Sequence, residues 1–445
     1  MFDSSCWEVL IEKVIEIAES LVKVIFENEI FRQYPEKMKE IIALLQNVEY
    51  LCIPHECDDE TVKLISKSCP NLKELDLRDA IYISDEAVKS LCGDGFESLG
   101  IRSLRILRLD CADISNETIA FILKNMSSLE IFIHCHLTRV LYSLHKMDLI
   151  EDKLHTIKKY SLTELYFGSD YSTDLVEVLT ICTVLCPNVK KLSCPVDMQE
   201  HIDLCSKFSK LEDLTLANFN TQSPLNLDEF LKLKGANLSA LSIEGFSLST
   251  SALIQNCQRL EKLRLKNVDF HCTKNASIPT LRLLREFSID TENLPISLAA
   301  EALSLILKTS PNIENLSILH SELTDLQLNN TLLKYCEQNT LKCLNFSFSE
   351  VDVNFLVLII ISCTSLKRLN VEFCKDIHIE DIDMLTQAAS STKNMPEIIW
   401  NDDEISDFSL YSDYDDFIDD YDAYDGYDTD DSYGEFYDDS YELSE

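Results

Sequence analysis

The chain has 445 residues, 46% of them hydrophobic, and its formal net charge at pH 7 is −38. A chain of this composition can bury a large core, but its acidity argues against partners with a phosphate backbone and against anionic membrane surfaces. We therefore expect neither nucleic acid nor a membrane among its partners.

Residues 6–31 are predicted to form an amphipathic helix, because apolar residues recur at steps of three and four from Trp7 to Phe26. Pro35 separates this helix from a second one at about residues 36–46. We expect residues 1–46 to act as a helical cap that covers the open end of a repetitive core. Binding of a partner by the first helix is the alternative interpretation.

From residue 47 to about residue 400, a short phrase recurs about fourteen times: an apolar residue, two spacers, an apolar residue, one spacer and an apolar residue. The clearest copies occupy residues 72–77, 104–109, 211–216, 260–265 and 366–371, and weaker copies centre on Leu51, Phe132, Leu165, Leu192, Leu241, Phe287, Leu316, Leu344 and Ile398. Successive central residues lie 22 to 33 positions apart. This phrase and period predict an α/β solenoid, a crescent of about fourteen strand–helix units whose short parallel strands line the concave face.

Each strand is expected to lead through a turn into a helix. In the unit that starts at Leu72, Ser84 is predicted to cap a helix that carries Asp85 and Glu86 in its first turn. The longest step, from Phe132 to Leu165, predicts an additional helix or a loop at the rim.

Seventeen cysteines occur in the chain, and several precede a strand phrase at fixed positions, among them Cys69, Cys186, Cys257 and Cys363. A cysteine in a repeat register behaves as a small buried apolar residue. The chain shows neither a signal segment at its start nor an apolar run of membrane-spanning length. We expect free thiols and a cytoplasmic or nuclear location.

Residues 401–445 differ in composition from the rest of the chain. They hold 19 Asp and Glu residues, no Lys or Arg, and eight of the 16 tyrosines, so they account for half of the net charge. Like charges at this density repel one another and few aliphatic residues are available for burial, which predicts a disordered acidic tail. Basic proteins are its expected partners.

The spacers on either side of each central residue should point outward, because side chains of a strand alternate between the two faces of its sheet. The candidate partner-binding residues on the concave face are Arg108, Tyr166, Lys262, Arg264, Lys266, Asn345, Arg368 and Asn370. Three of them, Lys262, Arg264 and Lys266, place positive charges on one strand and should repel one another unless an anion is near. The cluster is either a solvated strand face or a site for an anionic segment of a partner or of the acidic tail. A row of Ser and Thr at the same positions in other strands has a simpler interpretation, which is that it keeps neighbouring side chains small.

The sequence predicts no catalytic, cofactor-binding or metal-binding residue. Cys52, His55 and Cys57 lie close together, but no second pair follows at zinc-finger spacing. His134 and His136 would share one face of a strand, and two ligands are too few for a metal site. Neither a phosphate-binding loop nor a nucleophile elbow is present.

The repeats resemble the cysteine-containing class of leucine-rich repeats. The resemblance rests on Cys69-Pro-Asn-Leu72-Lys-Glu-Leu75-Asp-Leu77 followed by Ile83-Ser-Asp-Glu-Ala87-Val88, on Asn256-Cys257-Gln-Arg-Leu260 and on Ser362-Cys363-Thr-Ser-Leu366. This class is best known from F-box leucine-rich-repeat proteins, the substrate receptors of cullin-based ubiquitin ligases. The resemblance implies a protein client on the concave face and a cullin adaptor at the N-terminus.

The N-terminal segment leaves the F-box question open. An F-box usually opens with Leu-Pro and continues into an Ile-Phe helix and a Cys-x-x-Trp segment. Residues 1–46 contain Val24-Ile25-Phe26 but no Leu-Pro and no Trp downstream. A diverged F-box, a lost F-box and a plain helical cap are all open.

We therefore expect a non-catalytic protein-recognition module, most specifically a substrate receptor in a cullin-based ubiquitin-ligase pathway. A second resemblance, to GTPase-activating proteins for the Ran GTPase, rests on repeats joined to an acidic tail. Its implication, a Ran-GTPase-activating-like regulator, is one alternative. A scaffold or histone-binding protein that uses its acidic tail is another.

Overall fold

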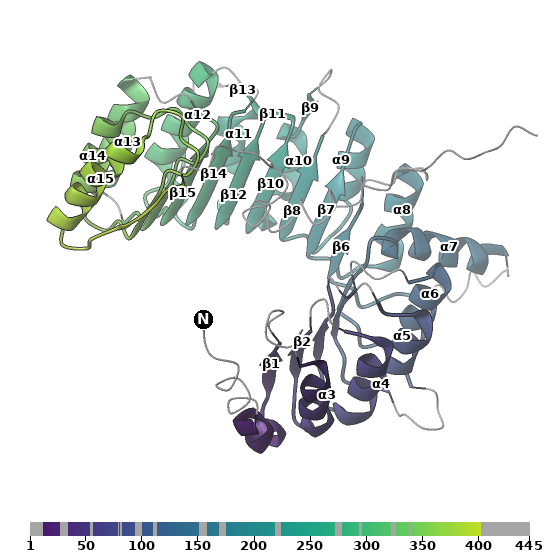
Figure 1. Ribbon diagram of the computed structural model, residues 1–445. Coiled ribbons are helices and arrows are strands. Elements are labelled where there is room, and N and C mark those ends of the chain that lie inside the picture. The colour runs from purple at the N-terminus through teal and green to yellow at the C-terminus, as the bar shows by residue number, and fades with distance from the viewer. Residues whose placement is uncertain are drawn as a thin grey trace, which may run out of the picture. The chain divides into compact units, whose positions relative to one another are not determined.

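The computed structural model describes residues 12–26, 34–53, 57–78, 80, 82–93, 100–109, 114–150, 158–168, 175–218, 224–271, 278–292, 296–321, 326–338 and 340–401. Short strands alternate with helices along these residues, and the strands form two larger parallel sheets and one small one, with the helices packed beside one another (Figure 1). The predicted α/β solenoid of strand–helix units is confirmed.

The first sheet has five strands, β1 (Lys23–Ile25), β2 (Tyr50–Cys52), β3 (Glu74–Asp76), β4 (Ile106–Arg108) and β5 (Ile131–Ile133). The second sheet has ten, β6 (Glu164–Tyr166), β7 (Lys191–Pro195), β8 (Asp213–Ala217), β10 (Ala240–Glu244), β12 (Lys262–Lys266), β14 (Glu286–Asp290), β15 (Asn315–Leu319), β16 (Cys343–Asn345), β17 (Arg368–Asn370) and β18 (Glu397–Ile399). A third, smaller sheet joins β9 (Leu225–Asn226), β11 (Phe246–Ser249) and β13 (Asp269–His271).

The helices that follow these strands differ in length. They are α3 (Pro35–Leu44), α4 (Asp59–Ser68), α5 (Asp85–Leu91), α6 (Asn116–Asn125), α7 (Leu137–Ile150), α8 (Leu175–Leu185), α9 (Gln199–Cys205), α10 (Asp228–Lys234), α11 (Thr250–Asn256), α12 (Ile296–Thr309), α13 (Leu326–Gln338), α14 (Val353–Ser362) and α15 (Ile379–Ser391), with 3-10 turns η1 (Ala18–Ser20) and η3 (Gly235–Asn237). The longest step, between β5 and β6, contains α7 as its one helix among the described residues, and residues 151–157 of this step lie outside the described part of the chain.

The strand register confirms the phrase residue by residue. Each of the fourteen predicted central residues lies in a strand, and within each sheet it pairs with the central residue of the neighbouring strand, as Leu241 pairs with Leu263 and Leu263 with Phe287. Thirteen of these side chains are buried in the core, and Ile398 in the last strand is partly buried against it. The apolar phrase therefore fixes the register, because a slip by one residue would turn the apolar side chains toward solvent.

The predicted helix over residues 6–31 is wrong over residues 21–26. Residues 12–17 are helical, but β1 pairs in parallel with β2, so that Val24 lies beside Leu51. Val24 and Phe26 are buried whereas Lys23 and Ile25 are exposed, which is the alternation of a strand. Leu21, Val24 and Phe26 follow the same apolar phrase as the later units, and the β-branched residues favour pairing with the adjacent strand over a helix.

Buried cysteines end helices just ahead of strand phrases. Cys69, Cys257 and Cys363 occupy the C-cap positions of α4, α11 and α14. Burial raises the pKa of the Cys69 and Cys257 thiols to about 12, so these groups stay protonated and pack as small apolar residues. The predicted role of the repeat cysteines as buried apolar residues is confirmed at these positions.

Carboxylates couple successive units at the start of their helices. Asp85, the first residue of α5, accepts hydrogen bonds from the backbone N–H (2.9 Å) and the hydroxyl (2.5 Å) of Ser115, the N-cap of α6. Asp59 accepts the same pair of bonds from Ser84, the N-cap of α5. Ser84 is thus at the predicted cap, but its hydroxyl bonds to the preceding unit rather than to its own helix.

Two further predictions depend on residues outside the described part of the chain. The predicted acidic tail falls on residues after 401, and the Cys52–Cys57 cluster includes His55; neither the tail nor His55 is described. Within the residues that the structure describes, no helix is long and apolar enough to span a bilayer.

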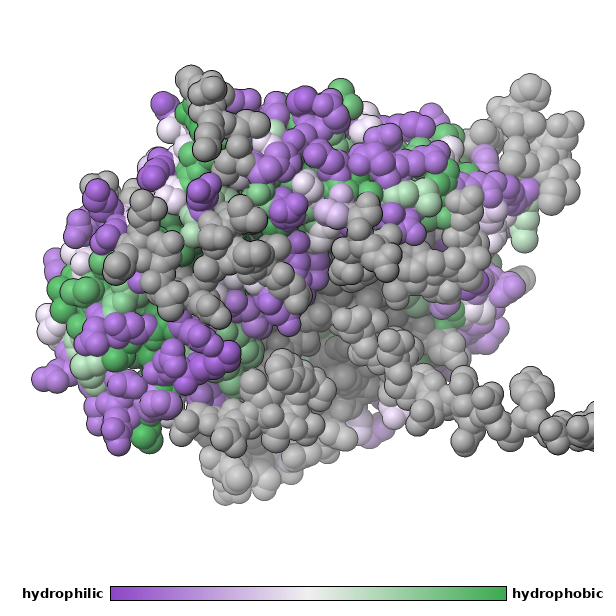
Figure 2. Space-filling model, turned by 90° about the horizontal axis from the view of Figure 1, so that it is seen from above, coloured by the Kyte–Doolittle hydropathy of each residue, from purple (hydrophilic) through white to green (hydrophobic). Residues whose placement is uncertain are grey.

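Hydrophobic side chains are visible between hydrophilic ones at the end of the molecule that carries the last helices (Figure 2). Leu358 and Ile361 of α14 are half-exposed.

Candidate functional site

The face of the ten-stranded sheet that is turned away from the helices is the candidate site, and we call it the open sheet face. In β12, Lys262 and Arg264 are exposed while Leu263 and Leu265, which alternate with them, are buried. The strands pair in parallel and in register, so the first, third and fifth residues of successive strands form three rows across the sheet.

The first row carries alternating charges. The Nζ of Lys262 lies 2.9 Å from a carboxylate oxygen of Glu286, and the Nε of Arg368 lies 3.2 Å from one of Glu397. Lys191 is in register with Glu164 on one side and Asp213 on the other. The charged groups of this row are therefore compensated within the chain.

The fifth row is compensated in the same way. The Nζ of Lys266 lies 3.4 Å from a carboxylate oxygen of Glu244, and the Nδ1 of His320 lies 3.0 Å from one of Asp290. The hydrogen bond to Asp290 raises the pKa of His320 above its ordinary value although burial acts in the opposite direction. Two of the three bases on β12 thus have acidic neighbours, which relieves the repulsion that the sequence predicts.

The third row is different, because its middle part consists mainly of small hydroxyl side chains. Between Tyr166 at one end and Asn345, Asn370 and Ile399 at the other, its members in order across the sheet are Ser193, Thr215, Ser242, Arg264, Ser288 and Ser317. Among the residues that the structure describes, none accepts or donates a hydrogen bond with these five hydroxyl groups, and none places a carboxylate within ion-pair distance of Arg264. The third row is therefore the part of the open sheet face with unused hydrogen-bonding capacity.

Lys191 contacts the ring of Tyr166, and its pKa is affected by the charge of Arg108, which belongs to the other large sheet. Its Nζ lies 5.5 Å from the centre of the Tyr166 ring. Burial lowers the pKa of Lys191, and the positive charge of Arg108 acts in the same direction. Burial also raises the pKa of Asp213 on the next strand, against the attraction of Lys191. Charges with perturbed pKa values are frequent at functional sites, although ion-pair networks perturb them as well.

Tyr166 and Arg108 themselves are largely committed to neighbours. Tyr166 is buried, with 8% of its surface exposed, and its hydroxyl donates to Glu164 at 2.6 Å. Arg108 forms ion pairs with Glu74 and with Asp76. Both residues lie on strands as predicted, but their side chains are largely buried and bonded within the chain.

Asn345 and Asn370 stabilise turns of their own units. The side-chain oxygen of Asn345 accepts hydrogen bonds from the backbone and the hydroxyl of Ser347, and that of Asn370 accepts the backbone N–H of Glu372. Asn370 is only 3% exposed. Of the eight predicted site residues, Lys262, Arg264, Lys266 and Arg368 remain the most accessible to a partner.

An aromatic stack beside the fifth row was not predicted. The rings of His320 and Phe348 are 5.0 Å apart, those of Phe348 and Phe373 are 4.9 Å apart, and both pairs are nearly parallel. All three residues have positive φ angles, at a turn position that Gly245 and Asn267 occupy in earlier units. Glycine and asparagine in a sequence indicate a backbone with positive φ, but aromatic residues do not. The sequence signal for the stack is therefore limited to the shared position of its residues after the strand phrase.

The histidine pair of residues 134–136 has a structural explanation. His134 is buried just after β5, and its Nδ1 accepts the backbone N–H of His136 at 3.1 Å. This bond shapes the turn that leads into α7.

Comparisons with known proteins agree with the repeat architecture. A sequence model described as leucine rich repeat matches residues 68–92. No curated protein sequence matches the chain. Among solved structures, the chain is similar to an internalin, InlF of Listeria monocytogenes, at 14% identity, with 89% of this chain and 94% of that one covered and a TM-score of 0.34. It is similar to a chain of the Rad7 and Elc1 complex of yeast at 12% identity, with 89% and 94% covered and a TM-score of 0.47. It is also similar to LegL7 of Legionella pneumophila at 12% identity, with 73% and 93% covered and a TM-score of 0.33.

The strand phrase, the parallel register and the matched repeat together define a leucine-rich-repeat solenoid. Such solenoids present extended surfaces that bind other proteins.

Proposed function

We propose that this chain is a non-catalytic protein-recognition module that binds an extended segment of a client along the open sheet face, and that it acts as a substrate receptor in a cullin-based ubiquitin-ligase pathway. The observation that carries the recognition role is the third row. Its hydroxyl groups have no partner among the described residues, and its small side chains leave room for a peptide backbone to approach. The receptor role rests on the resemblance of the repeats to F-box leucine-rich-repeat proteins.

The N-terminal end of the array offers a surface for an adaptor subunit. Ile17, Val22 and Ile25 lie within nine residues of one another, and each exposes slightly more than half of its surface. Ile25 belongs to β1, the edge strand of the five-stranded sheet. Aliphatic side chains gathered at one end of a solenoid favour a protein contact there.

The recognition role is tested by crosslinking in cells. A photoreactive amino acid replaces Ser288 on the open sheet face in one full-length variant and Leu233 in another. Leu233 is 71% exposed on α10 and serves as the matched control. We expect defined client bands from position 288 that are absent at position 233 and that disappear when Ser242→Trp blocks the third row. Bands at both positions, or bands that persist with Ser242→Trp, would contradict recognition by this face.

The receptor role is tested by co-precipitation of the full chain from cell extract. We expect cullin-adaptor subunits with the wild type and their loss with the triple variant Ile17→Asp, Val22→Asp and Ile25→Asp, while Leu233→Asp retains them. Recovery of the Ran GTPase or of histones in place of adaptor subunits would instead support one of the two alternative functions.

A further inference from the structure

Arg264 carries a positive charge that the open sheet face leaves uncompensated. It lies in the third row between Ser242 and Ser288, which are its partners in register on β10 and β14. Its flanking cations on the same strand, Lys262 and Lys266, pair with Glu286 and Glu244. The three bases of β12 and the two carboxylates of Glu286 and Glu244 together carry one net positive charge, which is that of Arg264.

This charge stands out against the rest of the protein. Residues 1–400 contain 58 acidic and 39 basic residues, so the array as a whole is acidic. Asp213 on β8, two strands away, is a further acidic group, whose ionisation both Lys262 and Arg264 favour through their charges. Asp213 belongs to the first row and lies two strands from Arg264, and no carboxylate of the described residues is within ion-pair distance of Arg264.

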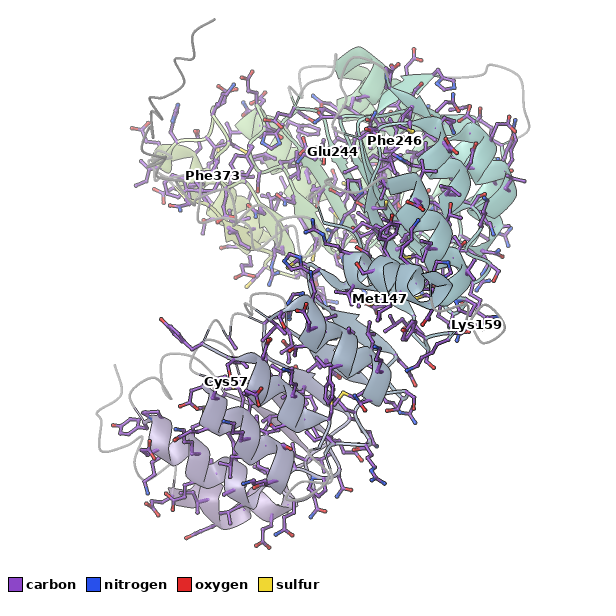
Figure 3. The ribbon with its side chains drawn as sticks, turned by 90° about the vertical axis from the view of Figure 1, so that its right-hand side faces the viewer. Cys57, Met147, Lys159, Glu244, Phe246 and Phe373 are labelled. Atoms are coloured by element: carbon purple, nitrogen blue, oxygen red, sulfur yellow. The ribbon has the colours of Figure 1, made fainter. Side chains whose placement is uncertain are left out.

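The neighbours of Arg264 suit a carboxylate. A guanidinium group donates two parallel hydrogen bonds to one carboxylate group, and such charge-assisted bonds are about twice as strong as neutral ones. The Ser242 and Ser288 hydroxyls on the adjacent strands can each donate a further bond. One net positive charge matches one carboxylate, whereas a doubly charged phosphate would leave a negative charge beside Glu244 (labelled in Figure 3) and Glu286.

The third row also sets the length of segment that it can hold. From Ser193 to Ser317 the row crosses five strand-to-strand steps of about 4.8 Å each, which is about 24 Å. An extended chain rises about 3.3 Å per residue, so about seven residues span the row. Arg264 lies near its middle.

We infer that the client segment is an extended peptide with a central Asp or Glu whose carboxylate binds Arg264 between Ser242 and Ser288, while the neighbouring hydroxyl groups bind the peptide backbone. This inference rests on the proposed recognition of a client by the open sheet face and specifies its chemistry.

Random nonapeptides displayed on phage and selected on the purified full chain test the inference. We expect the selected peptides to be enriched in Asp or Glu at one central position. Selection on Arg264→Gln should remove this enrichment. Selection on Arg368→Gln should retain it, because Arg368 is on the same face but already pairs with Glu397. Both substitutions replace exposed side chains, and thermal unfolding of each variant confirms that the fold is intact.

A synthetic version of the best peptide gives the energetic test. Replacing its central acid by the matching amide should weaken binding to the wild type about tenfold, since a hydrogen bond to a charged group is worth about that factor. The same replacement should change binding to Arg264→Gln less than twofold, because the partner charge is absent. Raising the salt concentration should weaken the wild-type complex more than the Arg264→Gln complex.

The outcomes separate this inference from the proposed function. Peptides that bind and are blocked by Ser288→Trp, but show no preference for a central acid, would overturn the Arg264 site and leave recognition by the face intact. Tenfold tighter binding of a phosphoserine peptide than of its Glu counterpart would also overturn the inference, because phosphate would then be the ligand. Failure to select any peptide, or binding that is unaffected by Ser288→Trp, would overturn both.

Discussion

The contact between Asp85 and Ser115 makes a quantitative prediction about how successive repeats are held together. Asp85→Ala removes two hydrogen bonds, at 2.9 and 2.5 Å, that both end on a charged carboxylate and that join α5 to α6. Hydrogen bonds to charged groups contribute about 1.5–3 kcal/mol in favourable cases, and Asp85 is only partly buried, so we expect a loss of about 2 kcal/mol for the pair. Because units of a solenoid contact mainly their neighbours, the loss should be local.

Hydrogen exchange of the amides in α5 and α6 measures this local loss. Faster exchange is expected at Ser115 and along α6, with little change in the last repeats. Glu86→Ala is the matched control, because Glu86 is the next residue, is largely exposed and makes only a 3.7 Å contact with Lys89. Burial opposes ionisation of Asp85, but the hydrogen bonds from Ser115 outweigh it and lower the pKa. The stabilisation should therefore be present above the ordinary pKa of an aspartate and disappear as the pH falls through the lowered value.

Equal exchange in the two variants would refute the argument, and so would a uniform acceleration throughout the array. A double-mutant cycle with Ser115→Ala adds a second criterion. The two substitutions should be partly non-additive, because both remove the hydroxyl bond, whereas Ser115→Ala keeps the bond from the backbone N–H. Additive effects would mean that Asp85 and Ser115 act independently.

Two further predictions concern the core and the fifth row. Leu263→Asp should cost several kcal/mol and lower the thermal unfolding midpoint, because it buries a charge between repeats, whereas Arg264→Asp on the same strand should change it little; similar effects would mean that the assigned register is wrong. Since Asp290 raises the pKa of His320, the His320–Asp290 pair should stabilise the fold fully below the ordinary histidine pKa and lose that contribution as the pH rises through the raised value. His320→Gln should abolish this part of the pH dependence in urea unfolding between about pH 6 and 8, and an unchanged pH profile would show that the pair does not contribute.

The apolar phrase determined the predictable part of the fold. Strand side chains alternate, so a row of leucines such as Leu241, Leu263 and Leu316 fixes which face is buried and how neighbouring strands align. The same phrase is present at Leu21–Phe26, but isoleucine and valine also recur there at three- and four-residue steps, a pattern that favours a helix. Pairing with β2 decides between the two patterns, and that neighbour is not visible in a local window.

The candidate site was predictable in position but not in chemistry. The spacer rule placed Lys262, Arg264 and Lys266 on one face, but it could not show that Glu286 and Glu244 neutralise two of them, because these acids belong to other repeats. The aromatic stack of Phe348 and Phe373 depends on positive φ angles that phenylalanine does not signal. The partner of a charged side chain that belongs to another repeat can therefore be named only when the strand register is known.

The distribution of these contacts determines where a client can bind at low energetic cost. A peptide that crossed the first or fifth row would have to displace carboxylates from Lys262 or Lys266, and would lose as much in broken ion pairs and desolvation as it gained. The third row has no such competitor among the described residues, since its hydroxyl groups and Arg264 exchange only water for a partner. A buried polar group that stays unpaired in a complex is costly, so a segment that offers no carboxylate to Arg264 should be rejected even if its backbone fits the row. Selectivity of the open sheet face should therefore reside in one residue of the client, opposite β12.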